Sequence, residues 1–408
     1  METSLLAFAT DLVDEGIETV LTNVQERAGA DEVTLAVAYH SARDVFPHNP
    51  VRKVRYLEGG AVFFAPEPSR YEGLRLKPHP SGLVGPGDPL GDLCEAAEGR
   101  AMSVNAWAVF LHSDRLGFEH PDCATQNAFG DRYLTDLCPA NPDVRAYARA
   151  LTSDIVSYGV SNIFAESLHF HGLGHGYHHE RYFEELGTVG TFLLGLCFCG
   201  HCLEVANLSG VDAELVHRLV RDELELRFKV GQGSEQPKEL TREALQPFGG
   251  GQLLGYIDAR IRTVTSLAEE ISAASEENTN VAFLDLSGAE KGFATGEPTG
   301  GASIELGWQN GVEVAALREA CDMITVTGYA ADPARLALDL EAYRSVIPDA
   351  ARLCVLLRPM PPDCRSADNL AEKVELVRKL GVGRVDFYHY GFFRLRALDW
   401  IRQSLVAT

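Results

Sequence analysis

The sequence has no apolar run near the roughly 20 residues that a membrane-spanning helix requires. Its N-terminus also lacks the basic n-region of a secretory signal. Positive charge is scarce, because Lys and Arg total 36 against 58 Asp and Glu, for a formal net charge of -22. An acidic chain of this kind is a poor partner for nucleic acid or an anionic membrane. We therefore expect a soluble cytoplasmic protein that binds neither, and homo-oligomerisation through an apolar patch stays open.

Disulfide chemistry is also not indicated. The nine cysteines are an odd number, and without a secretory signal they favour a reducing cytoplasm. Cys321 and Cys354 lie in or beside apolar runs and are most simply small core residues. A G-x-G-x-x-G motif after the first predicted strand is missing, which removes the main support for a doubly wound open sheet with a nucleotide site. No organic cofactor is therefore predicted.

Apolar runs of strand length recur along the chain, rich in Val, Ile, Leu and Phe and nearly continuous. Such runs are typical of parallel strands buried on both faces. The predicted strands are Val33–Tyr39, Ala61–Ala65, Val104–Leu111, Val160–Ala165, Val281–Leu286, Met323–Thr327, Leu353–Leu357 and Val385–Tyr388. The N-terminal 20 residues predict an amphipathic helix, and only about 20 residues separate the first two of these strands, so the first connection is expected to be irregular.

Helical patterns lie between most of these runs. They are Pro142–Ser157 with Asn141 as cap, Asp212–Phe228, Leu253–Ser275, Asn310–Ala320, Pro333–Tyr343, Asp368–Leu380 and Phe393–Ser404. Alternating strands and helices predict right-handed crossovers and, with eight strands, an α/β fold of the (β/α)8 TIM-barrel type with long βα loops. We expect residues 1–408 to form a single barrel domain, with inserted loops at about 66–99, 167–212 and 287–308.

In such a barrel the chemistry lies at the carboxyl ends of the strands. The polar and aromatic residues at the predicted ends are Tyr39, His40, Asn105, Trp107, His112, Glu166, His169, His171, Asp285, Tyr329, Arg358, Asp386, Tyr388, His389 and Tyr390. Tyr and Trp rings stack on the apolar faces of sugars, and carboxylates and histidines bond their hydroxyls. The set therefore indicates a carbohydrate-binding site, formed by His40, Asn105, Trp107, His112, His169, His171, Glu305, Tyr329, Arg358, Asp386 and His389.

Glu166 is the strongest single candidate for catalysis. It ends the apolar segment Asn-Ile-Phe-Ala, so its carboxyl is expected in a partly apolar setting that raises its pKa toward that of a general acid. The alternative is a structural ion pair with an Arg or a His. Asp285, at the end of the next strand, is the candidate nucleophile or base, about 5–9 Å from Glu166 as in glycoside hydrolysis. Asp285 capping a loop or orienting a His or Arg is the alternative, with Glu305 and Asp386 as substitutes.

Two clusters suggest metal. The histidine-rich stretch after Glu166 contains glycines typical of a loop and does not match H-E-x-x-H. Its histidines could ligate a metal, bond a substrate or lie in solvent. The sharper signal is Cys197-Phe-Cys199-Gly-His-Cys202, which predicts a structural Zn²⁺ site completed by a fourth ligand from Cys123, Cys138, His201 or Cys94, with Cys123 the first choice. Three reduced thiols, or a redox pair of Cys199 and Cys202, are the alternatives.

The stretch around these clusters resembles a family of uncharacterised glycosyl-hydrolase-like TIM barrels. The shared features are WAVFLHSDRLG, NAFGD, LCPANPDVRAYARALTSDIVSYGVSNIFAES, an HG-x-HHE loop at His175–Glu180 and a C-[FY]-C-x-x-C cluster. They cover mainly residues 102–205 and, more loosely, the whole barrel. The resemblance implies a glycosidase-like fold and a carbohydrate substrate.

One departure bears on mechanism. Retaining barrel glycosidases often place carboxylates at the ends of strands four and seven, but strand seven here ends in Arg358. The second group must then come from another strand, a loop or a substrate acetamido group. We predict a glycoside hydrolase acting on a small oligosaccharide or glycosylated metabolite. The rivals are a metal-dependent barrel enzyme, such as a sugar isomerase or hydrolase, that uses Glu166, Asp285 and histidines, and a non-catalytic sugar-binding barrel.

Overall fold

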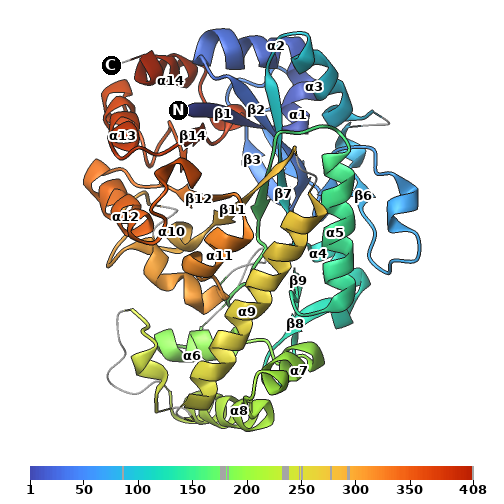
Figure 1. Ribbon diagram of the computed structural model, residues 1–408, viewed down its shortest axis with the longest axis vertical. Coiled ribbons are helices and arrows are strands. Elements are labelled where there is room, and N and C mark those ends of the chain that lie inside the picture. Colours follow the sequence, from blue (N-terminus) through green and yellow to red (C-terminus); the bar gives the residue numbers. More distant parts are fainter. Residues whose placement is uncertain are drawn as a thin grey trace.

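The computed structural model contains a closed barrel of parallel strands with helices around it (Figure 1). It describes residues 1–84, 87–174, 181, 183–231, 239–247, 249, 251–275, 278–291 and 295–406. The barrel strands are β1 (Glu2–Phe8), β2 (Glu32–Tyr39), β7 (Ser103–Val109), β10 (Asn162–Glu166), β11 (Asn280–Asp285), β12 (Met323–Thr327), β13 (Leu353–Leu357) and β14 (Arg384–Phe387). Each pairs in parallel with its neighbour, and β1 closes the ring by pairing with both β14 and β2. The predicted (β/α)8 barrel is confirmed.

Two elements differ from the sequence-based prediction. The N-terminal segment predicted as a helix begins with β1, in which every residue from Thr3 to Phe8 is buried. The helical pattern belongs to the residues after it, in α1 (Ala9–Glu15) and α2 (Ile17–Thr22). The predicted strand Ala61–Ala65 is only β5 (Ala61–Val62), which pairs antiparallel with β2 and is not one of the barrel strands. Burial of this apolar run, and not membership of the ring, explains its composition.

The predicted helices are present, and in Figure 1 they lie outside the strands. They are α5 (Pro142–Val156), α8 (Ala213–Val230), α9 (Gly251–Ala274), α11 (Val314–Ala320), α12 (Pro333–Val346), α13 (Ala367–Lys379) and α14 (Arg396–Val406). Asn141 caps α5 as predicted, because its side chain accepts hydrogen bonds from the backbone N–H groups of Asp143 and Val144. Among the residues described, no helix combines the length and apolar character needed to cross a membrane.

The long connections carry further structure. The stretch predicted as a loop at 66–99 includes the ten-residue helix α3 (Pro89–Glu98). After β10 come α6 (Gly187–Leu194) and α7 (Gly200–Leu208), which pack with α8 and one end of α9 at the bottom of Figure 1. The smaller elements are β3 (Ala42–Val45), β4 (Val54–Leu57), β6 (His79–Pro80), α4 (Asp114–Glu119), β8 (Ala124–Gln126), β9 (Arg132–Leu137), α10 (Ser287–Glu290) and the 3-10 helix η6 (Ser303–Asn310).

The deep interior of the barrel is polar. The Arg384 guanidinium, 1% exposed, donates to Asp386 at 2.9 Å and also to Glu32. The Asn105 amide donates to Glu32 at 2.7 Å, and the Asn162 amide donates to Asn105 at 2.7 Å. These bonds compensate charges that would otherwise be costly to bury. They also fix which residues of each strand face inward.

Strand alternation then sets the orientation of the two candidate carboxylates. Glu166 is four residues after the inward-facing Asn162 and shares its face. Asn280, on the next strand, donates its amide to Asn162 at 3.1 Å and also faces inward. Asp285 is five residues after Asn280 and therefore faces the surrounding helices.

Because β1 closes the ring, its buried residues should be important for stability. Replacing Leu5, 0% exposed, by alanine should lower the free energy of unfolding by about 2–5 kcal/mol. The matched change Val13→Ala on α1, where Val13 is 51% exposed, should alter it by less than about 0.5 kcal/mol. Urea unfolding followed by circular dichroism measures both. Equal, small effects would contradict the placement of the N-terminus in the barrel wall.

Candidate active site

Aromatic rings gather inside the carboxyl end of the barrel. Phe8 on β1 lies 5.0 Å from the ring of Tyr39 on β2 and 6.0 Å from that of Trp107 on β7. Tyr39 and Trp107 are 4.8 Å apart, and Trp107 lies 5.7 Å from Tyr388, which follows β14. Tyr329, after β12, lies 6.1 Å from Tyr388. These five rings, here termed the aromatic layer, come from strands that are far apart in sequence.

Glu166 extends into the aromatic layer from the end of β10. The Trp107 indole Nε1–H donates a hydrogen bond to its carboxylate Oε2. Burial raises the pKa of Glu166 to about 7, and the hydrogen bond from Trp107 opposes that rise. No Lys, Arg or His among the described residues forms an ion pair with it. Glu166 therefore has the protonation behaviour expected of a general acid at neutral pH.

Arg358 continues the layer on the side of β13. Its guanidinium lies 4.1 Å from the centre of the Tyr329 ring, a cation–π arrangement. It is also ion-paired with Asp363, and the two side chains are 7% and 1% exposed. Burial raises the pKa of Asp363, and the hydrogen bond from Arg358 opposes this rise. Arg358 thus contacts the aromatic layer through Tyr329, while Trp107 of the same layer contacts Glu166 directly.

The predicted histidines form a second group beside this layer. His40 stacks on Tyr39 at 4.2 Å and lies 5.1 Å from His112, which is 5.5 Å from His171. His169 is 5.0 Å from His171. Burial lowers the pKa of His40 and of His112 to about 4, so both imidazoles are neutral at physiological pH.

A carboxylate that the sequence analysis missed joins these histidines. Asp136 Oδ1, on β9, lies 3.4 Å from Nδ1 of His112 and 3.6 Å from Nδ1 of His171. One ligand atom from each of the three lies within 4.8 Å of the others, close enough to share a metal ion. The remaining histidines of the HG-x-HHE motif, within 175–180, lie outside the described residues.

Of the other predicted site residues, His389 packs against the aromatic layer, and the rest lie outside it. Asp285 is 1% exposed, and its carboxylate accepts bonds from the Ser287 backbone and hydroxyl and from the Tyr343 hydroxyl at 2.6 Å. Asn105 and Asp386 belong to the deep polar interior described above. His389 packs against Phe8 at 3.9 Å and is fully buried. Glu305 lies in η6 and is exposed.

Asp44, on the short strand β3, is a carboxylate that the sequence analysis did not single out. Burial raises its pKa to about 6. Its Oδ2 is buried, and no hydrogen-bond partner for it occurs among the described residues. The charges of Asp44 and Glu166 both raise the pKa values of Tyr39 and Tyr388, so the two carboxyls flank the same pair of phenols. The sequence of β3, Ala-Arg-Asp-Val, carries no pattern that would have identified it.

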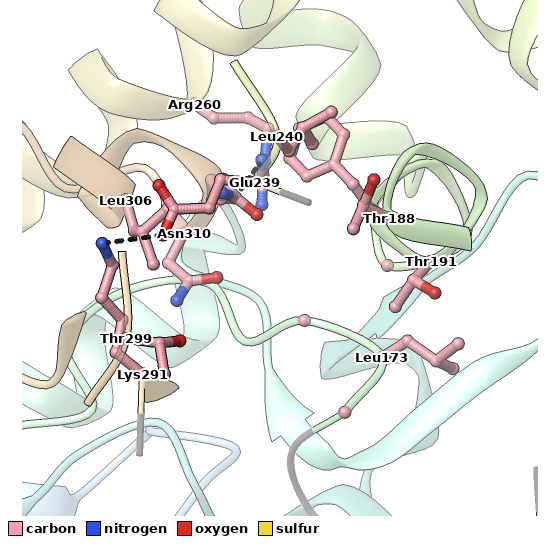
Figure 2. Close-up of a pocket in the computed structure, with 15 residues that line it drawn as sticks. Leu173, Thr188, Thr191, Glu239, Leu240, Arg260, Lys291, Thr299, Leu306 and Asn310 are labelled. Carbon is pink, nitrogen blue, oxygen red and sulfur yellow. Dashed lines mark hydrogen bonds and ion pairs between the residues drawn. The ribbon is translucent and has the colours of Figure 1, made fainter. Parts of the chain in front are cut away.

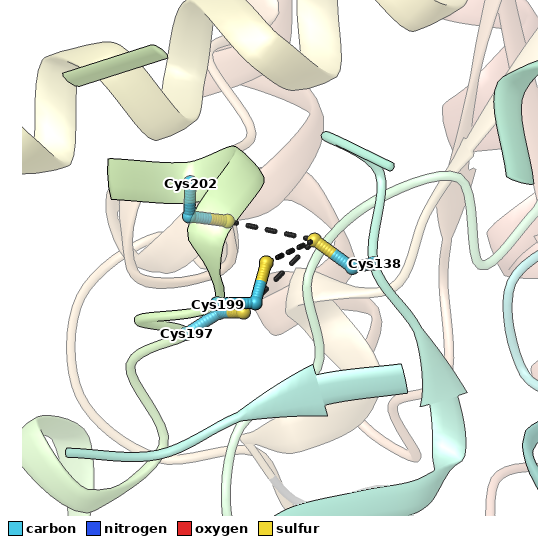
Figure 3. A group of neighbouring side chains, drawn as sticks. All are labelled: Cys138, Cys197, Cys199 and Cys202. Carbon is cyan, nitrogen blue, oxygen red and sulfur yellow. Dashed lines mark hydrogen bonds between the residues drawn. The ribbon is translucent and has the colours of Figure 1, made fainter. Parts of the chain in front are cut away.

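The predicted cysteine cluster is assembled, with a different fourth member. Cys197, Cys199 and Cys202 lie around Cys138, all buried, with the four Sγ atoms within 4.8 Å of one another (Figure 3). Cys123, the first choice from the sequence, is not in this group. It meets Cys138 through the backbone instead, where its carbonyl accepts the Cys138 N–H at 2.8 Å.

A cavity of about 500 Å³ opens among the loops that follow β10 and β11. Thr188 and Thr191 of α6 line one side, and Asn310 and Lys291 line the other (Figure 2). The Lys291 ammonium is 3.3 Å from Glu239, and the Arg260 guanidinium closes a further wall. Its volume is in the range of small-molecule sites. The first residue along the chain that lines this cavity is Gly172, which directly follows His171.

Comparison with known proteins supports the fold. No protein-family model and no curated protein matches the chain. Among solved structures, the catalytic domain of a β-amylase from Paenibacillus polymyxa aligns with a TM-score of 0.58 at 9% identity, over 99% of this chain and 97% of that one. A β-galactosidase from Marinomonas ef1 gives 0.52 at 10%, over 100% and 59%. An α-L-fucosidase from Paenibacillus thiaminolyticus gives 0.55 at 11%, over 99% and 48%. At these identities the likeness shows a shared barrel fold.

The Trp107–Glu166 hydrogen bond gives a prediction that can be tested by titration. Trp107→Phe removes the one interaction that lowers the Glu166 pKa, so that pKa should rise above about 7. Carbon-13 NMR of glutamate-labelled protein, with Glu166→Gln to assign the resonance, measures the shift. The control Trp308→Phe alters an indole that packs on Phe192 and should leave the titration unchanged. A Glu166 pKa that does not respond to Trp107→Phe would contradict this account of the site.

Proposed function

We propose that this protein is a glycoside hydrolase in which Glu166 is the general acid. The observation that carries the proposal is a carboxyl with a pKa raised to about 7, placed at the end of a barrel strand and bordered by aromatic rings. Protonation of the glycosidic oxygen requires an acid that keeps its proton near neutral pH. The rings of Tyr39, Trp107 and Tyr388 offer apolar faces for a sugar. Three structural neighbours are glycosidases by name, in agreement with this function.

We propose Asp44 as the second carboxylate, required in its ionised form. Asp285, the candidate from the sequence, faces the helices and has both oxygens bonded within the protein. A carboxylate held in this way positions the β11 loop and is poorly placed to attack a sugar. Asp44 retains a buried oxygen with no partner among the described residues, and it flanks the same tyrosines as Glu166. Burial raises the pKa of Asp44 to about 6 and that of Glu166 to about 7, and the proposal requires Asp44 to be the carboxyl that is ionised.

The remaining polar groups would bind the substrate. Arg358 and Tyr329 lie on one side of the aromatic layer, and His40 and His112 on the other. Neutral imidazoles can donate and accept hydrogen bonds with sugar hydroxyls. We take the substrate to be a small oligosaccharide or glycosylated metabolite, and the cavity among the loops after β10 and β11 has the volume of a small-molecule site. The buried, unoxidised cysteines are compatible with a cytoplasmic location.

A metal-dependent hydrolase or sugar isomerase is the second candidate. One observation favours it, namely that His112, Asp136 and His171 offer three ligand atoms within 4.8 Å of one another. Two histidines and a carboxylate suit several divalent transition metals. The group adjoins the aromatic layer through His40, so a metal there could polarise a substrate oxygen. The hydrogen-bonded geometry around Asp136 also accounts for these residues without a metal.

Turnover of a panel of aryl glycosides by wild type and Glu166→Gln tests the proposal. For substrates with poor leaving groups, the variant should lose about 10²–10⁴-fold in kcat, the usual contribution of a general acid. Glu305→Gln is the matched control, because Glu305 lies outside the aromatic layer, and it should retain activity within a few-fold. Unchanged turnover in Glu166→Gln would refute the proposed role of Glu166.

The same panel with EDTA separates the two candidate functions. The carboxylate mechanism predicts that turnover survives chelation of an exchangeable metal. Loss of turnover with EDTA, restored by added metal and abolished by His112→Ala, would favour the metalloenzyme. Binding of sugars without turnover by wild type, unaltered in Glu166→Gln, would indicate a barrel that binds carbohydrate without cleaving it.

The pH profile of kcat/KM should be bell-shaped, with limbs near about 6 and 7. Glu166 must be protonated, so activity falls as pH rises through its pKa. Asp44 must be ionised, so activity falls as pH drops through its pKa. With an activated aryl glycoside, Glu166→Gln should lose the alkaline limb alone and Asp44→Asn the acid limb. An alkaline limb that persists in Glu166→Gln would contradict the assignment of the acid.

A further inference from the structure

The four buried cysteines of the cluster have the spacing of a tetrahedral metal site. The Sγ atom of Cys138 lies 3.5 Å from those of Cys199 and Cys202 and 3.9 Å from that of Cys197. Four sulfurs about 2.3 Å from a Zn²⁺ ion are about 3.8 Å apart. A disulfide would require about 2.05 Å, and all four cysteines are unpaired thiols in the structure. The sulfurs are therefore too far apart for a bond and at the separation that a single ion requires.

Two stretches of chain that are distant in sequence bring the thiols together. Cys138 follows β9, Cys197 and Cys199 lie in the turn after α6, and Cys202 lies in the first turn of α7 (Figure 3). Cys199 is the N-cap residue of α7, whose positive dipole end favours thiolate at this position. Sequence separations of up to 64 residues are bridged by these contacts. Four thiols from these two stretches converge on one point, whereas inert core cysteines are usually scattered.

The surroundings support sulfurs that carry charge. The Gln126 backbone N–H donates to Cys197 Sγ at 3.3 Å, the kind of outer contact that stabilises a ligating thiolate. The backbone carbonyl of Cys197 is itself fixed by a hydrogen bond from the Tyr256 hydroxyl. These contacts hold the turn that presents Cys197 and Cys199 in a single orientation.

A buried cation faces the cluster. Arg260 on α9 is 3% exposed and packs over the Phe170 ring at 4.5 Å. No ion pair links it to a carboxylate among the described residues, and its Nε has no hydrogen-bond partner there. Burial lowers its pKa, while the Tyr256 phenol and the thiols of Cys202, Cys197 and Cys138 oppose that shift. Zn²⁺ with four thiolates carries two net negative charges, which would supply the missing counter-charge for this guanidinium.

We propose that Cys138, Cys197, Cys199 and Cys202 together hold one structural Zn²⁺ ion. All four coordination positions are filled by protein, so the ion has no open position for a substrate. Its role would be to stabilise the fold. It would tie the end of β9 to the α6–α7 turn. Asp136 lies two residues before Cys138 and contacts His112, so the same clamp would also support the histidine group of the candidate active site. The inference is independent of the proposed glycosidase activity.

Metal content of the purified full-length protein tests the proposal. After passage over a chelating resin, wild type should retain about one zinc per chain by elemental analysis. Cys138→Ser should retain less than one-tenth of that amount. Cys123→Ser is the matched control, because Cys123 is equally buried and adjoins Cys138 but is outside the thiol group, and it should keep its zinc.

Cobalt substitution of wild type gives a readout that does not depend on how the variants fold. Co²⁺ in a tetrahedral four-thiolate site should give strong thiolate-to-metal charge-transfer bands and intense visible d–d bands. Chelation under mildly denaturing conditions should release the zinc and lower Tm. Wild type that carries no zinc after growth in zinc-supplemented medium, and whose four cluster thiols react with a thiol reagent, would overturn the proposal. One equivalent of iron in place of zinc would overturn the assignment of the metal.

Discussion

The weakly polar surroundings of the Glu166 carboxyl are the constraint on which the candidate site depends. Burial at the aromatic end of the barrel raises the Glu166 pKa to about 7, and the hydrogen bond from Trp107 opposes that rise. The rings that border this end come from strands of a barrel that β1 closes. Beneath the layer, Arg384 and Asp386 form a compensated polar interior. Glu166 lacks such compensation among the described residues, so it holds its proton near neutral pH. Burial raises the pKa of both carboxyls. At Asp386 a buried guanidinium, Arg384, opposes the rise, whereas at Glu166 the opposing interaction is the neutral hydrogen bond from Trp107.

Much of the fold was predictable because parallel strands buried on both faces leave continuous apolar runs. The predicted runs Met323–Thr327 and Leu353–Leu357 coincide with β12 and β13. The first strand was missed because Thr3 and Ser4 interrupt its apolar character and the helical pattern of α1 follows at once. Ala61–Ala65 was assigned to the ring because apolar composition reports burial and does not report which neighbour a strand pairs with.

Strand alternation explains which site residues were predictable. Trp107, Glu166, Tyr329 and Arg358 lie on strands or directly after them, where the ends can be located from the sequence. Asp44 and Asp136 lie on short strands within the connections, and no local pattern shows that they approach the barrel end. Cys138 was one of four possible partners for Cys197, Cys199 and Cys202. The sequence could not single it out, because about 60 residues separate it from the others and such a separation does not show which side chains are close in space. Asp285 was predicted as a site residue because it ends a strand. Side chains alternate in direction along β11, however, and that of Asp285 points toward the helices.

The most direct test of the central claim is the dependence of the Glu166→Gln defect on the leaving group. A general acid matters most when the departing oxygen is basic, so kcat/KM for a series of aryl glycosides should show a defect that grows steadily with the pKa of the phenol. The account predicts a loss of about 10²-fold or more for the most basic phenol and little loss for dinitrophenol. A uniform loss across the series would contradict the role of Glu166 as the acid and leave it as a residue that binds or positions the substrate.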